Sequence, residues 1–87
     1  MRIWFKIWKD NRLLRDTTIE DFTQDTRTHK IFNALDACCL EFDLSRPLWL
    51  DTTVRDFKRH AKAHFTKDSF VEEIDFDSLE IHIIEED

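Results

Sequence analysis

The chain has 87 residues, a formal net charge of -6 and no glycine, and 41% of its residues are hydrophobic, among them eight Phe and three Trp. This length fits one domain, and the apolar content is enough to fill a core, which argues against intrinsic disorder. The acidic balance argues against general nucleic-acid binding, and the absence of glycine excludes P-loops and dinucleotide-binding fingerprints, in which the backbone must approach phosphate closely.

The N-terminal segment RIWFKIWK, residues 2–9, alternates between two faces: Ile3, Phe5 and Ile7 on one, and Trp4, Lys6 and Trp8 on the other. This period of two, in a run of β-branched and aromatic residues, predicts a strand. Asp10-Asn11 is a turn signal because both residues tolerate positive φ. A second strand then returns, which gives a hairpin from about Ile3 to Ile19.

The register of this hairpin stays open at the level of sequence. A two-residue loop places Leu14 opposite Ile7, whereas a three-residue loop places Ile19 opposite Ile3. A shift of one residue would exchange the two faces of the returning strand.

From Thr28 the apolar period becomes helical. Ile31, Leu35, Cys38 and Phe42 are spaced as one face of a long helix, with Phe32 and Cys39 beside them. Asp25, Thr26 and Thr28 are candidate N-caps. Pro47 ends the helical region, because the residue before a proline avoids the α conformation.

After the long helix we expect a short buried strand at residues 48–50, sequence LWL, followed by a second, shorter helix over residues 54–65. Thr53 and Asp56 resemble a capping box, and Val54, Phe57, Ala61 and Phe65 repeat at helical spacing. Near the C-terminus, Leu79, Ile81 and Ile83 alternate with Glu80, His82 and Ile84, which predicts a final, half-buried strand. The segment 70–76 fits either a short strand or an irregular stretch.

The element order is therefore hairpin, long helix, short strand, shorter helix and final strand, in a single domain over residues 1–87. This order predicts an α+β fold that resembles the β-grasp, or ubiquitin-like, fold. A split βαβ arrangement is the alternative, and it fits less well because it expects a helix directly after the first strand. Ubiquitin-type modifiers of the β-grasp fold end in Gly-Gly, so this chain, which ends in IIEED, is not expected to perform their reaction.

The face of the first strand that carries Trp4 and Trp8 is the first candidate site. If Ile3, Phe5 and Ile7 face the long helix, both Trp side chains point to the opposite side of the sheet. There they would form a protein-binding patch, unless the second helix or the final segment covers them.

The segment FKRHAKAHF, residues 57–65, is the second candidate site. Arg55, Lys58, Arg59 and Lys62 would form an exposed basic face on the second helix, able to hold phosphate or an acidic surface. The simpler interpretation, which we favour, is a solvated face or one that meets the acidic C-terminal tail. His60 and His64 would share a helix face, but HAKAH lacks the Glu of HExxH, so we expect no metal site.

The two cysteines, Cys38 and Cys39, are adjacent, which is a poor geometry for a disulfide and fits a reducing cytosol. No cation lies at helical spacing to activate either thiol, and no other residues form a catalytic pattern. No apolar run approaches the roughly 18 residues of a membrane helix. We therefore expect a cytoplasmic protein that has no membrane contact, contains no cofactor and is not an enzyme.

Three segments, TRTHKIFNAL, PLWLDTTVRDFKRHAKAHF and FVEEIDFDSLEIHIIEED, resemble a group of small uncharacterised proteins of clostridial bacteria. This resemblance implies a bacterial source and brings no function or site residue. The function expected from the residues is a non-catalytic protein-interaction module, whose partner is another protein or a second copy. The alternative is a nucleic-acid or phosphate binder that uses the basic helix.

Overall fold

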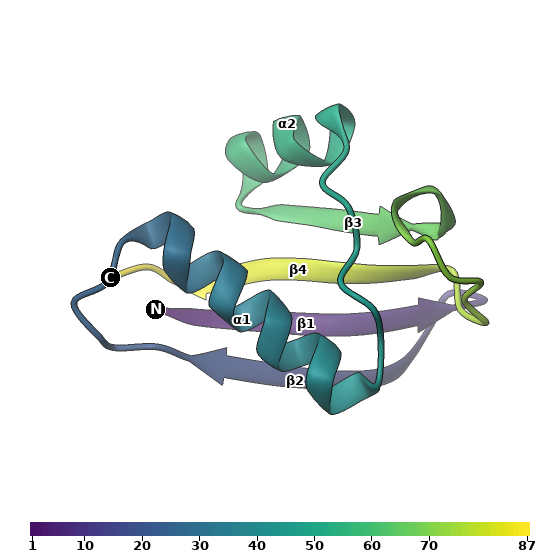
Figure 1. The fold of residues 1–87 in the computed structure, drawn as a ribbon, viewed down its shortest axis with the longest axis horizontal. Helices are drawn as coiled ribbons and strands as arrows, with labels where there is room; N and C mark the ends of the chain where they lie inside the picture. Colours follow the sequence, from purple (N-terminus) through teal and green to yellow (C-terminus); the bar gives the residue numbers. More distant parts are fainter.

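The computed structural model describes residues 1–87 as one four-stranded antiparallel sheet with two helices (Figure 1). The elements follow the chain in this order: β1 (Arg2–Lys9), β2 (Arg12–Glu20), α1 (Arg27–Phe42), α2 (Asp51–His60), β3 (Lys62–Thr66), the short 3-10 helix η1 (Lys67–Ser69) and β4 (Ser78–Glu85). The strand order in the sheet is β2-β1-β4-β3. The expected α+β domain with an N-terminal hairpin, a long helix, a second helix and a C-terminal strand is confirmed.

The likeness to the β-grasp fold is one of element order. The central strands β1 and β4 pair antiparallel, as do β1 with β2 and β3 with β4. The β-grasp fold instead pairs its first and last strands in parallel. The chain therefore shares the sequence of elements with that fold but not the direction of its last strand.

The hairpin has the two-residue turn but only one of the two pairings that the sequence left open: Ile3 lies opposite Ile19, whereas Ile7 lies opposite Arg15 and not Leu14. Its two-residue turn at Asp10-Asn11, with φ of 52° and 63°, pairs Trp8 with Leu13. A register shift between Ile7 and Trp8 then inserts one extra residue into β2, so that Ile3 lies opposite Ile19. Such a β-bulge lets the tight turn and the apolar pairing further along both be satisfied.

Helix α1 begins and ends through local signals in its sequence. Thr26 is the N-cap, and its hydroxyl accepts a hydrogen bond from the His29 backbone N–H at 3.2 Å. The predicted face of Ile31, Leu35, Cys38 and Phe42 is buried. The helix ends at Phe42 because Asp43 takes the left-handed conformation, and its N–H bonds back to carbonyls of the last turn.

The predicted strand at residues 48–50 is wrong, because this segment is an extended connection without strand pairing that leads into α2. Its Trp49 packs against Phe57 and Phe65, with ring centroids 5.4 and 4.8 Å apart. The buried apolar run therefore reflects side-chain packing and not membership of the sheet. The strand that joins the sheet from this region is β3, which follows α2.

The predicted second helix over residues 54–65 is also displaced. It begins earlier, at Asp51, with no side-chain cap, and Thr53 lies buried inside it. It ends at His60, because Ala61 has a φ of 54° and its N–H bonds to the Phe57 carbonyl. Ala63 and Phe65 then alternate with exposed residues along β3, a period-two pattern that the spacing of Phe57, Ala61 and Phe65 had concealed.

The core lies between one face of the sheet and the helices. It contains 17 buried hydrophobic residues, among them Ile3, Phe5 and Ile7 of β1, so the face of β1 that carries these three side chains is the buried one. The segment 70–76 is irregular, one of the two expected possibilities, and Phe70 and Phe76 contact each other edge to face in it. Neither helix is long and apolar enough to cross a membrane.

Candidate functional site

The face of the sheet opposite α1 carries no helix, and we call it the open face (Figure 1). The alternation of β1 places Trp4, Lys6 and Trp8 there, and both Trp side chains are half-buried. Strand pairing adds side chains from the other three strands: Leu13, Asp16 and Thr18 of β2, Ser78, Glu80 and His82 of β4, and Lys62, His64 and Thr66 of β3.

A buried ion pair lies at the centre of the open face. Lys6 and Glu80 are opposite each other in the register, their Nζ and Oε2 atoms are 3.1 Å apart, and the two residues are only 9% and 5% exposed. The Trp8 indole N–H donates to the other Glu80 oxygen at 2.9 Å. Burial alone would raise the pKa of the Glu80 carboxyl, but the bonds from Trp8 and Lys6 and the charge of Lys6 hold its pKa below the ordinary value.

Trp4 is held in a similar way on the other side of Lys6. Its indole N–H donates to Asp16 at 2.9 Å, and the Lys6 ammonium lies 3.7 Å from the centre of its ring. The His82 ring stacks beside it, with centroids 6.5 Å apart and planes 21° from parallel. Both indoles are therefore fixed by hydrogen bonds within the chain, while part of each ring stays accessible.

Two histidines surround the Glu80 carboxylate. His64 Nε2 and His82 Nδ1 lie 3.8 and 3.9 Å from its oxygens, and His64 Nδ1 shares a hydrogen bond of 3.1 Å with the Ser78 hydroxyl. The Nδ1 atom of His82 is buried without a hydrogen-bond partner. Burial and then the charge of Lys6 lower the pKa of His82, so its neutral form is favoured.

Trp4 and Trp8 could be identified as a candidate site from the sequence, whereas the ion pair between them and the two histidines beside it were not predicted. Glu80 and His82 alternate with the apolar residues of the final strand, which is a signal that they leave the core. Glu80 lies opposite Lys6, and His82 opposite Trp4, because β4 is the neighbour of β1 in the sheet. The alternation within one strand does not indicate this order of strands.

The four basic residues predicted as one face do not share a surface. Arg55, Lys58 and Arg59 lie on α2, are exposed and form no ion pair. Lys62 lies on β3, opposite His82 on the open face, because the helix ends before it. The basic surface of α2 is therefore smaller than expected.

The other titratable candidates are also separated or buried. His60 ends α2 and His64 lies on β3, so the predicted sharing of one helix face by these two histidines is wrong. Cys38 and Cys39 are free and buried in the core. Burial raises the pKa of both thiols, that of Cys39 to about 11, which keeps them protonated at neutral pH.

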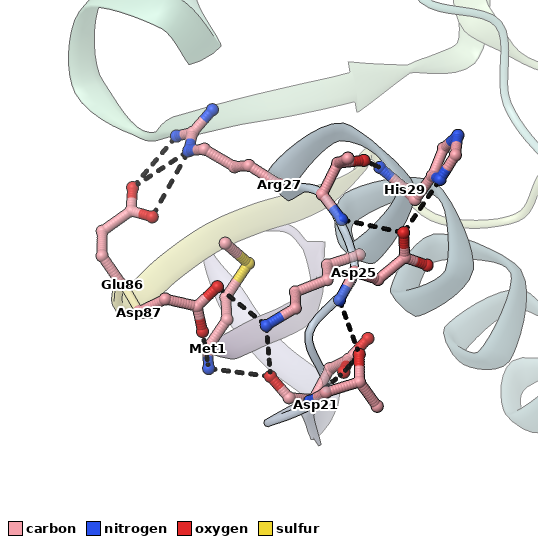
Figure 2. A network of polar contacts seen from close by, with 10 residues as sticks. Met1, Asp21, Asp25, Arg27, His29, Glu86 and Asp87 are labelled. Atoms are coloured by element: carbon pink, nitrogen blue, oxygen red, sulfur yellow. Dashed lines mark hydrogen bonds and ion pairs between the residues drawn. The ribbon is translucent and has the colours of Figure 1, made fainter.

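A second polar network joins the two ends of the chain to the start of α1 (Figure 2). The Met1 amino group donates to the Asp21 carbonyl and to the Asp87 carboxylate, at 2.9 and 2.8 Å. The buried Lys30 side chain also bonds to Asp87 at 2.8 Å, and these bonds lower the pKa of Asp87. Together with the ion pair between Arg27 and Glu86, they place part of the acidic tail at α1 and not at the basic residues of α2.

The chain matches no family model, and it matches neither a curated protein nor a solved structure. The resemblance of three segments to clostridial proteins therefore has no match to support it.

Proposed function

We propose that this chain is a non-catalytic, intracellular protein-binding domain whose contact surface is the open face. The observation that carries this proposal is the arrangement of Trp4 and Trp8, two half-buried indoles fixed around a buried ion pair on the side of the sheet without helices. Free, buried thiols at Cys38 and Cys39 support a reducing compartment.

Trp side chains that are already fixed in place are favourable contact residues. Tryptophan is enriched among the residues that dominate binding energy, because one side chain contributes a large contact area. The hydrogen bonds to Asp16 and Glu80 reduce the rotamer entropy that the indoles would otherwise lose on binding. Leu13, next to Trp8 in the register and 43% exposed, adds apolar surface at the rim. The partner is another protein or a second copy of the chain.

The test uses variants that change the rim of the open face and leave the central cluster intact. Leu13→Lys and Thr18→Lys place charges opposite Trp8 and Trp4 on the exposed edge strand β2. Leu40→Lys on α1 and Thr52→Lys on α2 introduce the same charges at exposed positions elsewhere. Each protein is immobilised and exposed to a cytosolic extract, and its own association state is measured by sedimentation.

We expect that the complex or dimer formed by the native chain is lost with the two rim variants and retained with the two controls. A monomer that captures nothing, or a complex equally affected by all four substitutions, would contradict the proposal.

A second candidate function is anion binding by α2, and the observation in its favour is that Arg55, Lys58 and Arg59 are exposed without ion-pair partners. We expect single-stranded nucleic acid, if it binds there, to be released steeply as salt is raised. Reversal of these three residues to Glu should abolish that binding. Lys62→Glu is the matched control, because Lys62 lies on the open face and should leave it unchanged.

A further inference from the structure

A groove of about 260 Å³ lies between α1 and α2, away from the open face. Its walls are mainly apolar and come from three parts of the chain: Ile31 and Phe32 of α1, Trp49 of the connection, and Val54 and Phe57 of α2. Phe32 contributes a ring that is 40% exposed and lies edge to face with Trp49. The groove therefore offers aromatic and aliphatic surface that the chain itself does not cover.

The remaining lining residues are Arg27, Thr28 and Lys58, so the mouth of the groove has cationic groups and no carboxylate. Arg27 uses its Nε and Nη2 atoms to bind Glu86, which compensates its charge and fixes the guanidinium 5.8 Å from the Phe57 ring. Lys58 has no ion-pair partner and contributes one uncompensated positive charge. The mouth is therefore complementary to a single negative charge.

The start of α1 is not part of this complementarity. The Asp25 carboxylate accepts a hydrogen bond from the Thr26 N–H, and the Thr26 hydroxyl accepts one from the His29 N–H, so the partial positive charge of this helix end already has partners. The indole N–H of Trp49 has no acceptor in the chain, but it is buried and is not an accessible donor in the groove.

We propose that this groove binds a small apolar carboxylate, with its hydrocarbon part between Phe32, Trp49 and Phe57 and its carboxylate at Lys58. The volume lies just below the range of about 300–1,000 Å³ that holds drug-sized ligands, which favours a short-chain or single-ring acid. The uncompensated charge of Lys58 selects a carboxylate over a neutral compound of the same shape. This site does not depend on the proposed role of the open face.

The three indole N–H resonances of the ¹⁵N-labelled protein provide the test. Trp49 lies in the groove, whereas Trp4 and Trp8 lie on the open face and serve as internal controls. Octanoate is the probe, and octan-1-ol is its uncharged counterpart. We expect octanoate, added below the concentration at which it forms micelles, to shift the Trp49 resonance saturably and leave the other two in place.

Two matched substitutions on α2 complete the experiment. Lys58→Gln removes the charge at the mouth and should weaken octanoate binding about threefold to fivefold, as expected for one exposed ion pair. Arg59→Gln removes an exposed charge that does not line the groove and should have no effect. The proposal is overturned if Trp49 does not respond, if octan-1-ol binds as well as octanoate, if all three indoles shift together, or if Lys58→Gln binds like the native chain.

Discussion

The two faces of the sheet are built from the same strands but are held together by different forces. Phe5 and Lys6 are adjacent in β1, and both are nearly inaccessible to solvent. Phe5 is part of the apolar core beneath the helices, where stabilisation follows the contact area and has no preferred direction. Lys6 lies in the open face, where stabilisation comes from one ion pair and directed hydrogen bonds.

This difference has a consequence for the pairing of β1 with β4. The contact between Lys6 and Glu80 exists only in the observed register, in which the two residues lie directly opposite each other. A slip of one residue would move Glu80 to the apolar side of the sheet and separate it from both Lys6 and Trp8. The core tolerates exchanges of similar volume, whereas the open face depends on the identity of each partner.

The largest effect should come from the face of the sheet that packs against the helices, which we call the covered face. Phe65 is fully buried and packs against Trp49 and other core residues. The substitution Phe65→Ala removes most of these contacts. We expect this substitution to lower the free energy of unfolding by about 3–5 kcal/mol, as is usual for a buried Phe replaced by Ala. Denaturation by urea measures the loss. Phe22→Ala is the control, because Phe22 is 63% exposed and should change the stability little.

The central ion pair should give the next largest effect, and only when one partner is removed. Glu80→Leu leaves Lys6 buried without a counter-charge, and we expect it to destabilise the fold by about 3 kcal/mol. The double variant Lys6→Met/Glu80→Leu should recover part of this loss, because two apolar side chains can occupy the same space, while the Trp8 indole N–H stays without its acceptor. Urea denaturation of Lys6→Met, Glu80→Leu and the double variant gives the coupling free energy between the two side chains. Additive losses would show that the two side chains act independently.

The covered face could largely be predicted from the sequence, because its signals are local. The spacing of Ile31, Leu35 and Cys38 identified the buried side of α1, and Asp10-Asn11 identified the hairpin turn. The end of α2 could not be predicted in the same way, since Phe65 fits both a helical and a strand spacing. Only the left-handed conformation of Ala61 separates the two interpretations.

The open face could be predicted only in part, because its contacts join residues far apart in the chain. The alternation in β1 placed Trp4 and Trp8 together, as the structure confirms. The contact of Lys6 with Glu80 spans 74 positions and depends on β4 being the neighbour of β1. The same reasoning explains Lys62, whose position on the open face follows from the pairing of β3 with β4.

A comparison within the open face should give a smaller effect. Trp8→Phe and Trp4→Phe make the same chemical change, but the Trp8 indole N–H bonds to the buried Glu80 and that of Trp4 to the exposed Asp16. A hydrogen bond to a buried charge is worth more than one in contact with water. We expect Trp8→Phe to destabilise the fold by about 1 kcal/mol more than Trp4→Phe, as measured by urea denaturation. Equal losses would place the two indoles in equivalent environments.

The smallest effect should be the response of the open face to pH. His82 faces Trp4 and Lys6 of β1, Glu80 of β4 and Lys62 of β3, and its pKa is lowered by burial and by Lys6. The folded chain therefore binds this proton less readily than the unfolded chain, so the stabilisation is present above the ordinary pKa of 6.5 and is lost as pH falls through the lowered value. Glu80 contributes in the same direction only at lower pH, below its ordinary value of 4.5.

Stability measured from about pH 7.5 down to pH 5.5 isolates the histidine contribution, because the carboxylates with lowered pKa stay ionised over that range. We expect the free energy of unfolding to decrease over this interval, and to decrease less in His82→Gln. His60→Gln is the control, since His60 is exposed at the end of α2 and its side chain forms no hydrogen bond or ion pair. If both variants kept the full slope, His82 would not be the source of the pH response, and the lowered pKa of this residue would not contribute to the stability of the open face.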